Sequence, residues 1–337
     1  MVRRVGRVAA LAFALAALAP VLSACGSPGS ASSGADVAWV ATDASVTLPG
    51  TAVTPVDLAD GVPGAPVTVG TLPSALAYTV DDAGLLVTAQ GVDTLSEIDP
   101  ATHDVVHSVG VGEEPDAVAL APGGTGGAGL ALVANLDADT VTPVDLGTWR
   151  AGAPIPVGKQ PVAVAVWASS SGTATAFVAD FGADEVTPID LSTMRAGAPI
   201  AVGSGPQTIA VAGSTVVVGN FTDSTLSTID APTEQVGSTV ALPFDPTGIA
   251  VDATGTTAYV CGGAAMVPVT VAGTALSVGG PVDLRDVAQG IALSSDGSTA
   301  WITQQDGSLV AVSLATGHVG RTVELGGHPS AIVIGAG

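Results

Sequence analysis

The sequence predicts an all-β protein, a seven-bladed β-propeller in which four-stranded blades form a closed ring. Three observations lead to this fold class. A unit of roughly 40–46 residues recurs along the chain. Each unit contains four short apolar stretches separated by turns, and the 44 glycines and 23 prolines are spread along the chain. No sustained apolar period of 3.6 residues follows the N-terminal segment, so little helix is expected.

The repeat is clearest in two stretches, VTPVDLGTWRAGAPIPVG (141–158) and VTPIDLSTMRAGAPIAVG (186–203), which match at 14 of 18 positions. One landmark is the proline after a glycine-containing turn, found at Pro73, Pro115, Pro161, Pro206, Pro246 and Pro329, with Ala288 in one slot. A second landmark is the small polar residue that ends an apolar strand, found at Asp57, Asp99, Asp145, Asp190, Asp230, Thr270 and Ser313. Because two independent landmarks share one period, the repeat is a property of the fold.

One unit contains four expected strands, A to D, for example at 162–167, 175–180, 185–190 and 198–203. Four short strands in a unit of this length are typical of a propeller blade. A single four-stranded sheet cannot bury both of its faces, so neighbouring blades must cover them.

Six blades are expected to begin at Ser74, Asp116, Val162, Gln207, Thr247 and Gln289. The seventh is split between the two ends of the chain. Residues 330–335 form a strand A with no blade after it, and the segment from Asp36 supplies strands B, C and D. Pairing them closes a ring over residues 36–337, with strand A of the C-terminus joined to the N-terminal strands.

The strand-B endings LVAN, FVAD, VVGN and YVCG, followed by VTPIDL and by Gly-x-Pro-Ile-x-Val-Gly, resemble the YVTN-type β-propeller repeat. The resemblance covers residues 36–337 and implies a seven-bladed propeller, often extracytoplasmic, without implying one activity. It is weaker in the blade that begins at Thr247, which lacks both the Asn or Asp that ends strand B and the Asp that ends strand C.

Residues 1–24 are interpreted as a signal peptide. A basic start (Arg3, Arg4 and Arg7) precedes an apolar stretch that contains Pro20 and is shorter than the roughly 20 residues of a membrane span. The following LSAC resembles a bacterial lipobox, which makes Cys25 the predicted lipidation site. Residues 25–35 are then a lipidated Cys and a flexible tether. We expect an extracytoplasmic protein held at the bacterial cell membrane by a lipid anchor.

The chain carries 30 acidic and 8 basic residues, a net charge of −22. Because such a surface repels phosphate backbones, no nucleic-acid partner is expected. An envelope protein, a small-molecule ligand or a cation remains compatible with this charge. The repeated Asp at the end of strand C is interpreted as a turn device that caps backbone N–H groups. Asn135, Asp180 and Asn220, at the ends of strands B, are interpreted as similar formers of the B–C turn.

In a propeller, the D–A connections and B–C loops share one face around the central channel, and this face usually carries the ligand. The expected ligand-binding residues at the channel mouth are Glu113, Asp116, Gln207, Asp245, Gln289 and His328. Neither the identity of a metal nor that of a cofactor follows from the sequence.

Two functions remain open. The first is a non-catalytic scaffold, tethered to the membrane, that binds a ligand or protein at the cell envelope. The alternative is a propeller enzyme of lactonase or lyase type, since propellers that resemble this one include such enzymes, with a metal-assisted site at the channel mouth. Glu113, Asp116, Asp245 and His328 would be its first candidates, provided that they converge on one point. The sequence contains no H-E-x-x-H, G-x-S-x-G or P-loop motif, so no catalytic residue is assigned.

Overall fold

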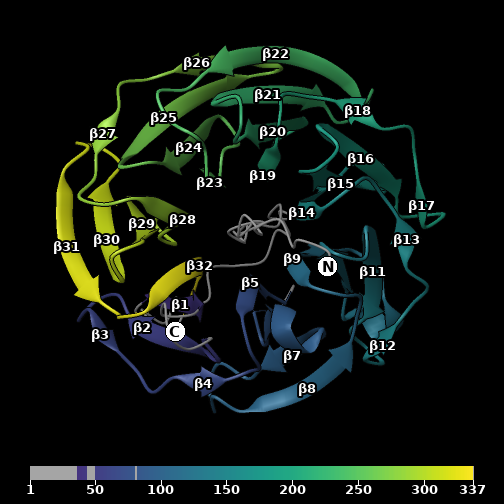
Figure 1. Ribbon diagram of the computed structural model, residues 1–337, viewed down its shortest axis with the longest axis horizontal. Helices are drawn as coiled ribbons and strands as arrows, with labels where there is room; N and C mark the ends of the chain where they lie inside the picture. Colours follow the sequence, from purple (N-terminus) through teal and green to yellow (C-terminus); the bar gives the residue numbers. More distant parts are fainter. Residues whose placement is uncertain (1–35, 44–49, 80–81, 337) are drawn as a thin grey trace, which may run out of the picture.

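The computed structural model describes residues 36–43, 50–79 and 82–336. Seven antiparallel sheets form a ring in which strand A of each blade lies innermost (Figure 1). The predicted seven-bladed β-propeller is therefore confirmed. The predicted leader, Cys25 and tether lie outside the described residues. Within the described ranges, no helix is long and apolar enough to cross a membrane.

The blades are numbered 1 to 7 from Pro73, so that blade 7 is the split one. Strands A are β5 (Pro73–Tyr78), β9 (Pro115–Ala121), β14 (Pro161–Ala168), β19 (Pro206–Ala212), β23 (Gly248–Val251), β28 (Ala288–Leu293) and β32 (His328–Ala336). Strands B are β6 (Leu85–Ala89), β10 (Leu130–Asn135), β15 (Ala174–Asp180), β20 (Thr215–Asn220), β24 (Thr257–Gly262), β29 (Thr299–Gln304) and β1 (Asp36–Asp43). Strands C are β7 (Thr94–Ile98), β11 (Thr140–Asp145), β16 (Glu185–Asp190), β21 (Thr225–Asp230), β25 (Ala265–Ala272), β30 (Ser308–Ser313) and β2 (Ala52–Asp57).

The outermost strand D is continuous in three blades, as β8 (Val105–Gly110), β22 (Gln235–Ala241) and β31 (Val319–Glu324). In the other four it is broken into pairs: β3 (Val62–Pro63) with β4 (Val67–Thr68), β12 (Arg150–Ala151) with β13 (Ile155–Pro156), β17 (Arg195–Ala196) with β18 (Ile200–Ala201), and β26 (Ala275–Val278) with β27 (Val282–Asp283). Two short 3₁₀ segments, η1 (Gln90–Val92) and η2 (Thr125–Gly127), are the helical elements of the described chain.

The broken outer strands follow from proline in strand C. The four blades concerned carry Pro55, Pro143, Pro188 and Pro268 in the middle of strand C. Proline has no N–H to donate to the neighbouring strand, so the ladder between strands C and D is interrupted there. The carbonyl of each proline still accepts a hydrogen bond from a glycine N–H of strand D, as Pro143 does from Gly152 at 2.7 Å.

The ring closes as predicted. β1 pairs with β32, with Trp39 opposite Val333, and β1 pairs on its other side with β2. The two ends of the described chain therefore lie in one sheet, and the closing blade is built from both (Figure 1).

The core lies between blades. Strand B carries a column of large side chains that face the neighbouring blade, among them Trp39, Phe177 and Trp301, which are 1%, 0% and 6% exposed. Cys261 is also fully buried and free. Burial raises the pKa of its thiol to about 12, so it acts as a small packed side chain.

Candidate functional site

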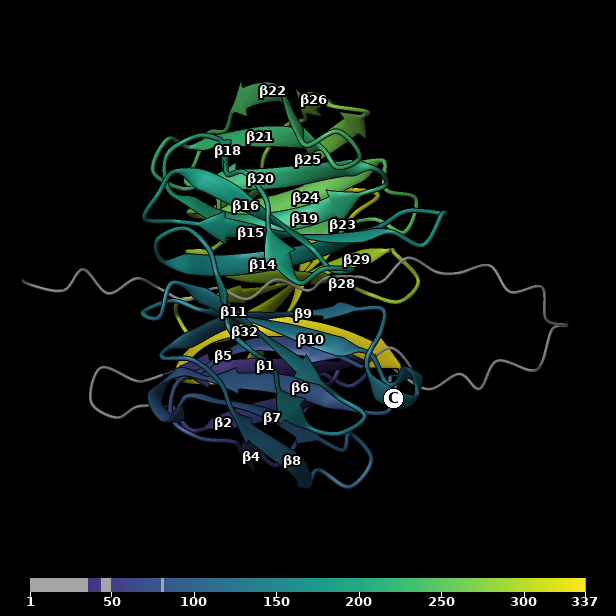
Figure 2. The ribbon, with the colours of Figure 1, turned by 90° about the vertical axis from the view of Figure 1, so that its right-hand side faces the viewer.

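The strands run between two end faces of the ring, where the connections collect (Figure 2). The D–A face is defined here as the end formed by the D–A connections and the B–C loops. Backbone hydrogen bonds join the two sets: Leu136 N–H donates to the Glu114 carbonyl at 2.8 Å, and Phe181 N–H donates to the Gln160 carbonyl at 2.9 Å. The six candidate ligand residues are predicted from the sequence to lie on this face.

Three acidic side chains of the B–C loops hold the connection that leads to the next blade. Asp93 Oδ1 accepts from Glu114 N–H at 3.0 Å, Asp139 Oδ1 from Gln160 N–H at 3.0 Å, and Asp184 Oδ1 from Gly205 N–H at 2.8 Å. The three residues that donate these N–H groups have φ of 50°, 53° and 62°, in the left-handed region. These carboxylates therefore stabilise bent loops, a structural role that repeats around three blades.

The amides that end strands B in blades 2 and 4 bridge the B–C turn, as predicted: Asn135 Nδ2 donates to the Thr140 carbonyl at 3.2 Å, and Asn220 Nδ2 donates to Thr225 Oγ1 at 2.9 Å. Their complete burial was not predicted. Asn135, Asp180 and Asn220 are each 0% exposed. Asn135 Oδ1 accepts from Gly112 N–H at 3.1 Å, and its Nδ2 donates to Thr142 Oγ1 at 2.9 Å. The side chain therefore lies inside the blade, where it links strands B and C to the D–A connection. Sequence reasoning missed this because the position directly precedes a turn.

The same cluster explains the glycine that follows strand D in the D–A connections of blades 1 to 3, at Gly112, Gly158 and Gly203. A Cβ added at Gly112 would lie 2.6 Å from Asn135 Cγ, and one at Gly203 would lie 2.5 Å from Asn220 Nδ2. The buried amide leaves no room for a side chain, so glycine is required by close approach rather than by a turn.

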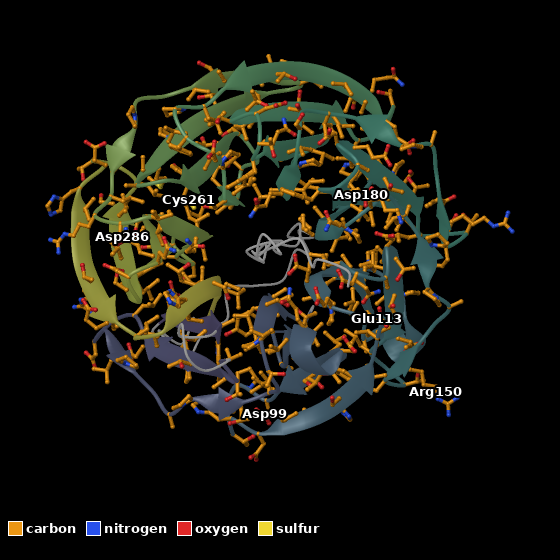
Figure 3. All side chains as sticks on the ribbon, viewed as in Figure 1. Asp99, Glu113, Arg150, Asp180, Cys261 and Asp286 are labelled. Atoms are coloured by element: carbon orange, nitrogen blue, oxygen red, sulfur yellow. The ribbon has the colours of Figure 1, made fainter. Side chains whose placement is uncertain are left out.

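Blade 3 places a carboxyl group where its neighbours have an amide. Thr187 Oγ1 donates to Asp180 Oδ2 at 2.5 Å, and Asp180 Oδ1 has no partner among the described residues. Burial raises the pKa of Asp180 to about 7; the Thr187 and Gly158 hydrogen bonds oppose this shift, and the charge of Glu185 adds to it. Figure 3 places Asp180 in the inner part of the ring, away from the rim.

Asp116 is the most deeply placed of the six candidate ligand residues. It is 0% exposed, Gln90 Nε2 donates to its Oδ1 at 2.5 Å, and its Oδ2 has no partner among the described residues. Burial raises the pKa of the Asp116 carboxyl well above its usual range, and the Gln90 hydrogen bond opposes this shift. Gln90 was missed by sequence reasoning, although it replaces the bulky apolar residue found at Leu136, Phe181 and Phe221.

The other candidates lie on separate blades. Gln207 and Gln289, at the starts of β19 and β28, are each 6% exposed. Glu113 is exposed, and Asp245 is exposed and accepts a hydrogen bond from Ser224 Oγ. His328 is half-buried, with its Nδ1 3.0 Å from the Gln305 carbonyl oxygen. Asp116, Asp245 and His328 thus contact different loops.

Within residues 36–43, 50–79 and 82–336, no group of three His, Cys, Asp or Glu side chains is placed to hold one metal ion. The D–A connections also carry two basic side chains, Lys159 and Arg285. Lys159 forms an ion pair with Asp139.

The repeated aspartates that end strands C cap backbone N–H groups, as predicted. Asp57 Oδ1 accepts from Ala59 N–H, Asp99 Oδ1 from Ala101 N–H and Asp190 Oδ1 from Ser192 N–H, each at 2.8 Å. Asp99 lies at the outer rim, as does Arg150 (Figure 3). These acids hold the C–D turns and are remote from the D–A face.

Comparison with known proteins gives similarity in structure alone. No family model matches the chain, and no curated protein matches it in sequence. A protein from Bacteroides uniformis, provisionally named a 6-phosphogluconolactonase, matches with a TM-score of 0.71 and 14% identity over 89% of this chain and 99% of its own. A protein of the same provisional name from Bacteroides fragilis has the same TM-score and identity over 91% and 99%. Kuenenia stuttgartiensis hydrazine synthase matches with a TM-score of 0.66 and 18% identity over 77% and 88%. At these identities the chain shares the propeller fold with all three.

Proposed function

We propose that this chain is a lipid-anchored, extracytoplasmic propeller of the YVTN-repeat type that acts as a non-catalytic binding scaffold at the cell envelope. One observation carries the scaffold proposal: candidate polar residues of the D–A face are engaged by residues of adjacent loops. Asp116 bonds to Gln90, Asp245 to Ser224, and His328 lies against the Gln305 carbonyl. An enzyme site needs several such groups directed at one reacting atom.

The charge of the D–A face supports a cationic or neutral partner. The face carries exposed carboxylates such as Glu113, Asp137 and Asp306, and one of its two basic side chains, Lys159, is paired with Asp139. A phosphorylated or otherwise anionic ligand would need unpaired Arg or Lys side chains to hold it. We therefore propose an envelope protein segment with net positive charge, or an uncharged small molecule, as the partner at this face.

The anchor rests on the leader sequence and is tested in cells. The full chain and its Cys25→Ala variant are expressed in a bacterial host with labelled palmitate. The parent is expected to carry label and to sediment with membranes, and the variant to lose both. A Cys25→Ala protein that still sediments with membranes contradicts the lipid anchor.

The scaffold proposal is tested against the enzyme alternative. That alternative is compatible with the fold that this chain shares with the two provisionally named lactonases. The full chain is assayed for hydrolysis of 6-phosphogluconolactone, and its melting temperature is measured with EDTA and then with Ca²⁺, Mg²⁺, Mn²⁺ or Zn²⁺. We expect no turnover above the spontaneous rate and no shift confined to one ion. Turnover, or an ion-specific shift that Asp116→Asn or His328→Ala abolishes, overturns the scaffold in favour of a metal-assisted enzyme.

A further inference from the structure

The end of the ring opposite the D–A face contains a hollow of about 620 Å³ between blades 3 and 4. Its walls are the end of β14, the A–B loop of blade 3, the tight turn at Gly213 and Ser214, and the C–D turn of blade 4. Sites for small ligands usually have volumes of about 300–1,000 Å³. The hollow arises because the A–B loop of blade 3 is long while the corresponding turn of blade 4 is tight.

Trp167 is the first departure from the repeat at this place. It occupies the seventh position counted from the proline landmark (Ala288 in blade 6), where the other six blades carry smaller side chains: Thr79, Ala121, Ala212, Asp252, Ser294 and Gly335. Its indole packs against the core shared by blades 3 and 4 and also lines the hollow, half-buried. Blade 4 lines the hollow with the tight turn at Gly213 and Ser214 and with the C–D turn residues Ala231, Pro232 and Glu234.

Glu234 is the second departure. It has φ of 56° in the C–D turn, a position at which blades 1 to 3 place a side chain that packs on the preceding blade or on strand D. His103 meets Trp39 edge to face with ring centres 5.1 Å apart, Trp149 stacks on His107 at 4.8 Å, and Met194 joins an apolar cluster. Glu234 places a carboxylate at the edge of the hollow, with Oε2 close to Gly197 of blade 3, and no hydrogen bond or ion pair within the described residues uses this carboxylate.

The remaining walls carry hydroxyl groups. Half of the twelve lining residues are Ser or Thr, and none is Lys or Arg. Ser169 Oγ bonds to Ser171 and Thr173 within the A–B loop, at 2.8 Å and 2.6 Å. The hydroxyls of Ser170, Thr175 and Ser214 make no hydrogen bond within the described part of the chain, which leaves them available to a ligand.

We propose that this hollow is a carbohydrate-binding site that takes a neutral mono- or disaccharide unit of a glycan. The exposed part of the Trp167 ring stacks against the apolar face of a pyranose, an arrangement that suits the large, rigid surface of an indole. The Glu234 carboxylate and the hydroxyls accept and donate hydrogen bonds to the sugar hydroxyls. A quaternary ammonium is less suited, because it is held by a cage of several aromatic rings and cannot use the hydroxyl groups.

The site goes beyond the proposed scaffold function and lies on the other end of the ring, so either can fail alone. The full chain in detergent is titrated with cellobiose, maltose and N,N′-diacetylchitobiose, with intrinsic tryptophan fluorescence and calorimetry as readouts. We expect a saturable fluorescence change for at least one disaccharide. Affinity should fall at least tenfold in Trp167→Ala and several-fold in Glu234→Gln, and Trp167→Phe should retain much of it.

Trp149→Phe is the matched control, since Trp149 stacks on His107 at the outer rim and is expected to leave sugar affinity unchanged. The melting temperature of each variant checks that the ring is intact. The proposal is overturned if none of the three disaccharides binds saturably, or if Trp167→Ala binds sugar with the same affinity as the parent. Saturable binding of choline or lysine in place of sugars overturns it in favour of a cation site.

Discussion

Replacing Asp180 by Asn should stabilise the protein, and only at neutral and alkaline pH. Burial raises the pKa of the Asp180 carboxyl to about 7 from an ordinary value of 3.8. A carboxyl whose pKa is raised in the folded state does not lower the free energy of unfolding below about pH 4, where it is protonated in both states. The free energy of unfolding falls progressively between about pH 4 and 7, and above about pH 7 the loss is complete. At about 1.4 kcal/mol per pKa unit, a difference of about 3 units corresponds to a penalty of about 4 kcal/mol.

Asparagine fits this position, because Asn135 and Asn220 occupy it in the adjacent blades and donate to a hydroxyl of strand C at 2.9 Å. Urea unfolding of the parent and the Asp180→Asn variant, at pH 4 to 8, measures the difference. We expect near equality at pH 4 and a gain of a few kcal/mol at pH 8.

The reverse substitution Asn135→Asp is the matched control, and it should lower the free energy of unfolding at pH 8 with the same pH dependence. The other acids of the chain are shared by both proteins, so their titration cancels in the comparison. A difference between parent and Asp180→Asn that stays constant from pH 4 to 8 refutes the reasoning.

Three further predictions follow from the ring. Deleting residues 330–337 removes most of β32, the partner of β1 in the closing blade, so cooperative thermal unfolding should be lost; an unchanged melt contradicts closure. Gly203→Ala should lower the free energy of unfolding by about 1–3 kcal/mol, because its Cβ would meet the buried Asn220 amide. Gly126→Ala is the control: its Cβ meets nothing within 4 Å, so any loss of stability there reports the backbone strain of its φ of 71° and the general effect of replacing glycine. Cys261 should react with a thiol reagent at pH 8 only as fast as the protein unfolds, and rapid labelling of the native chain argues against its burial.

The architecture was predictable because the same pattern of strands and turns recurs in every blade. Strand order, blade number and the split seventh blade follow from the spacing of prolines and strand-end residues such as Pro161 and Asp190. The capping role of Asp190 was also predictable, because an Asp followed by Ser or Thr caps its own turn locally.

The interior roles were not predictable from local pattern. Asn135 and Asp180 look like turn residues in sequence, and their burial depends on a D–A connection more than 20 residues away. The pairing of Gln90 with Asp116 likewise joins two blades.

The sequence by itself determined the class of fold, the number of blades and the closure of the ring, because these depend on period and apolar pattern. Only the tertiary structure decided which polar residues are buried, that Asp116, Asp245 and His328 contact adjacent loops, and that Trp167 and Glu234 line one hollow. The physical reason is that hydrogen-bond partners and burial are set by the packing of adjacent blades, which brings together residues far apart in the chain.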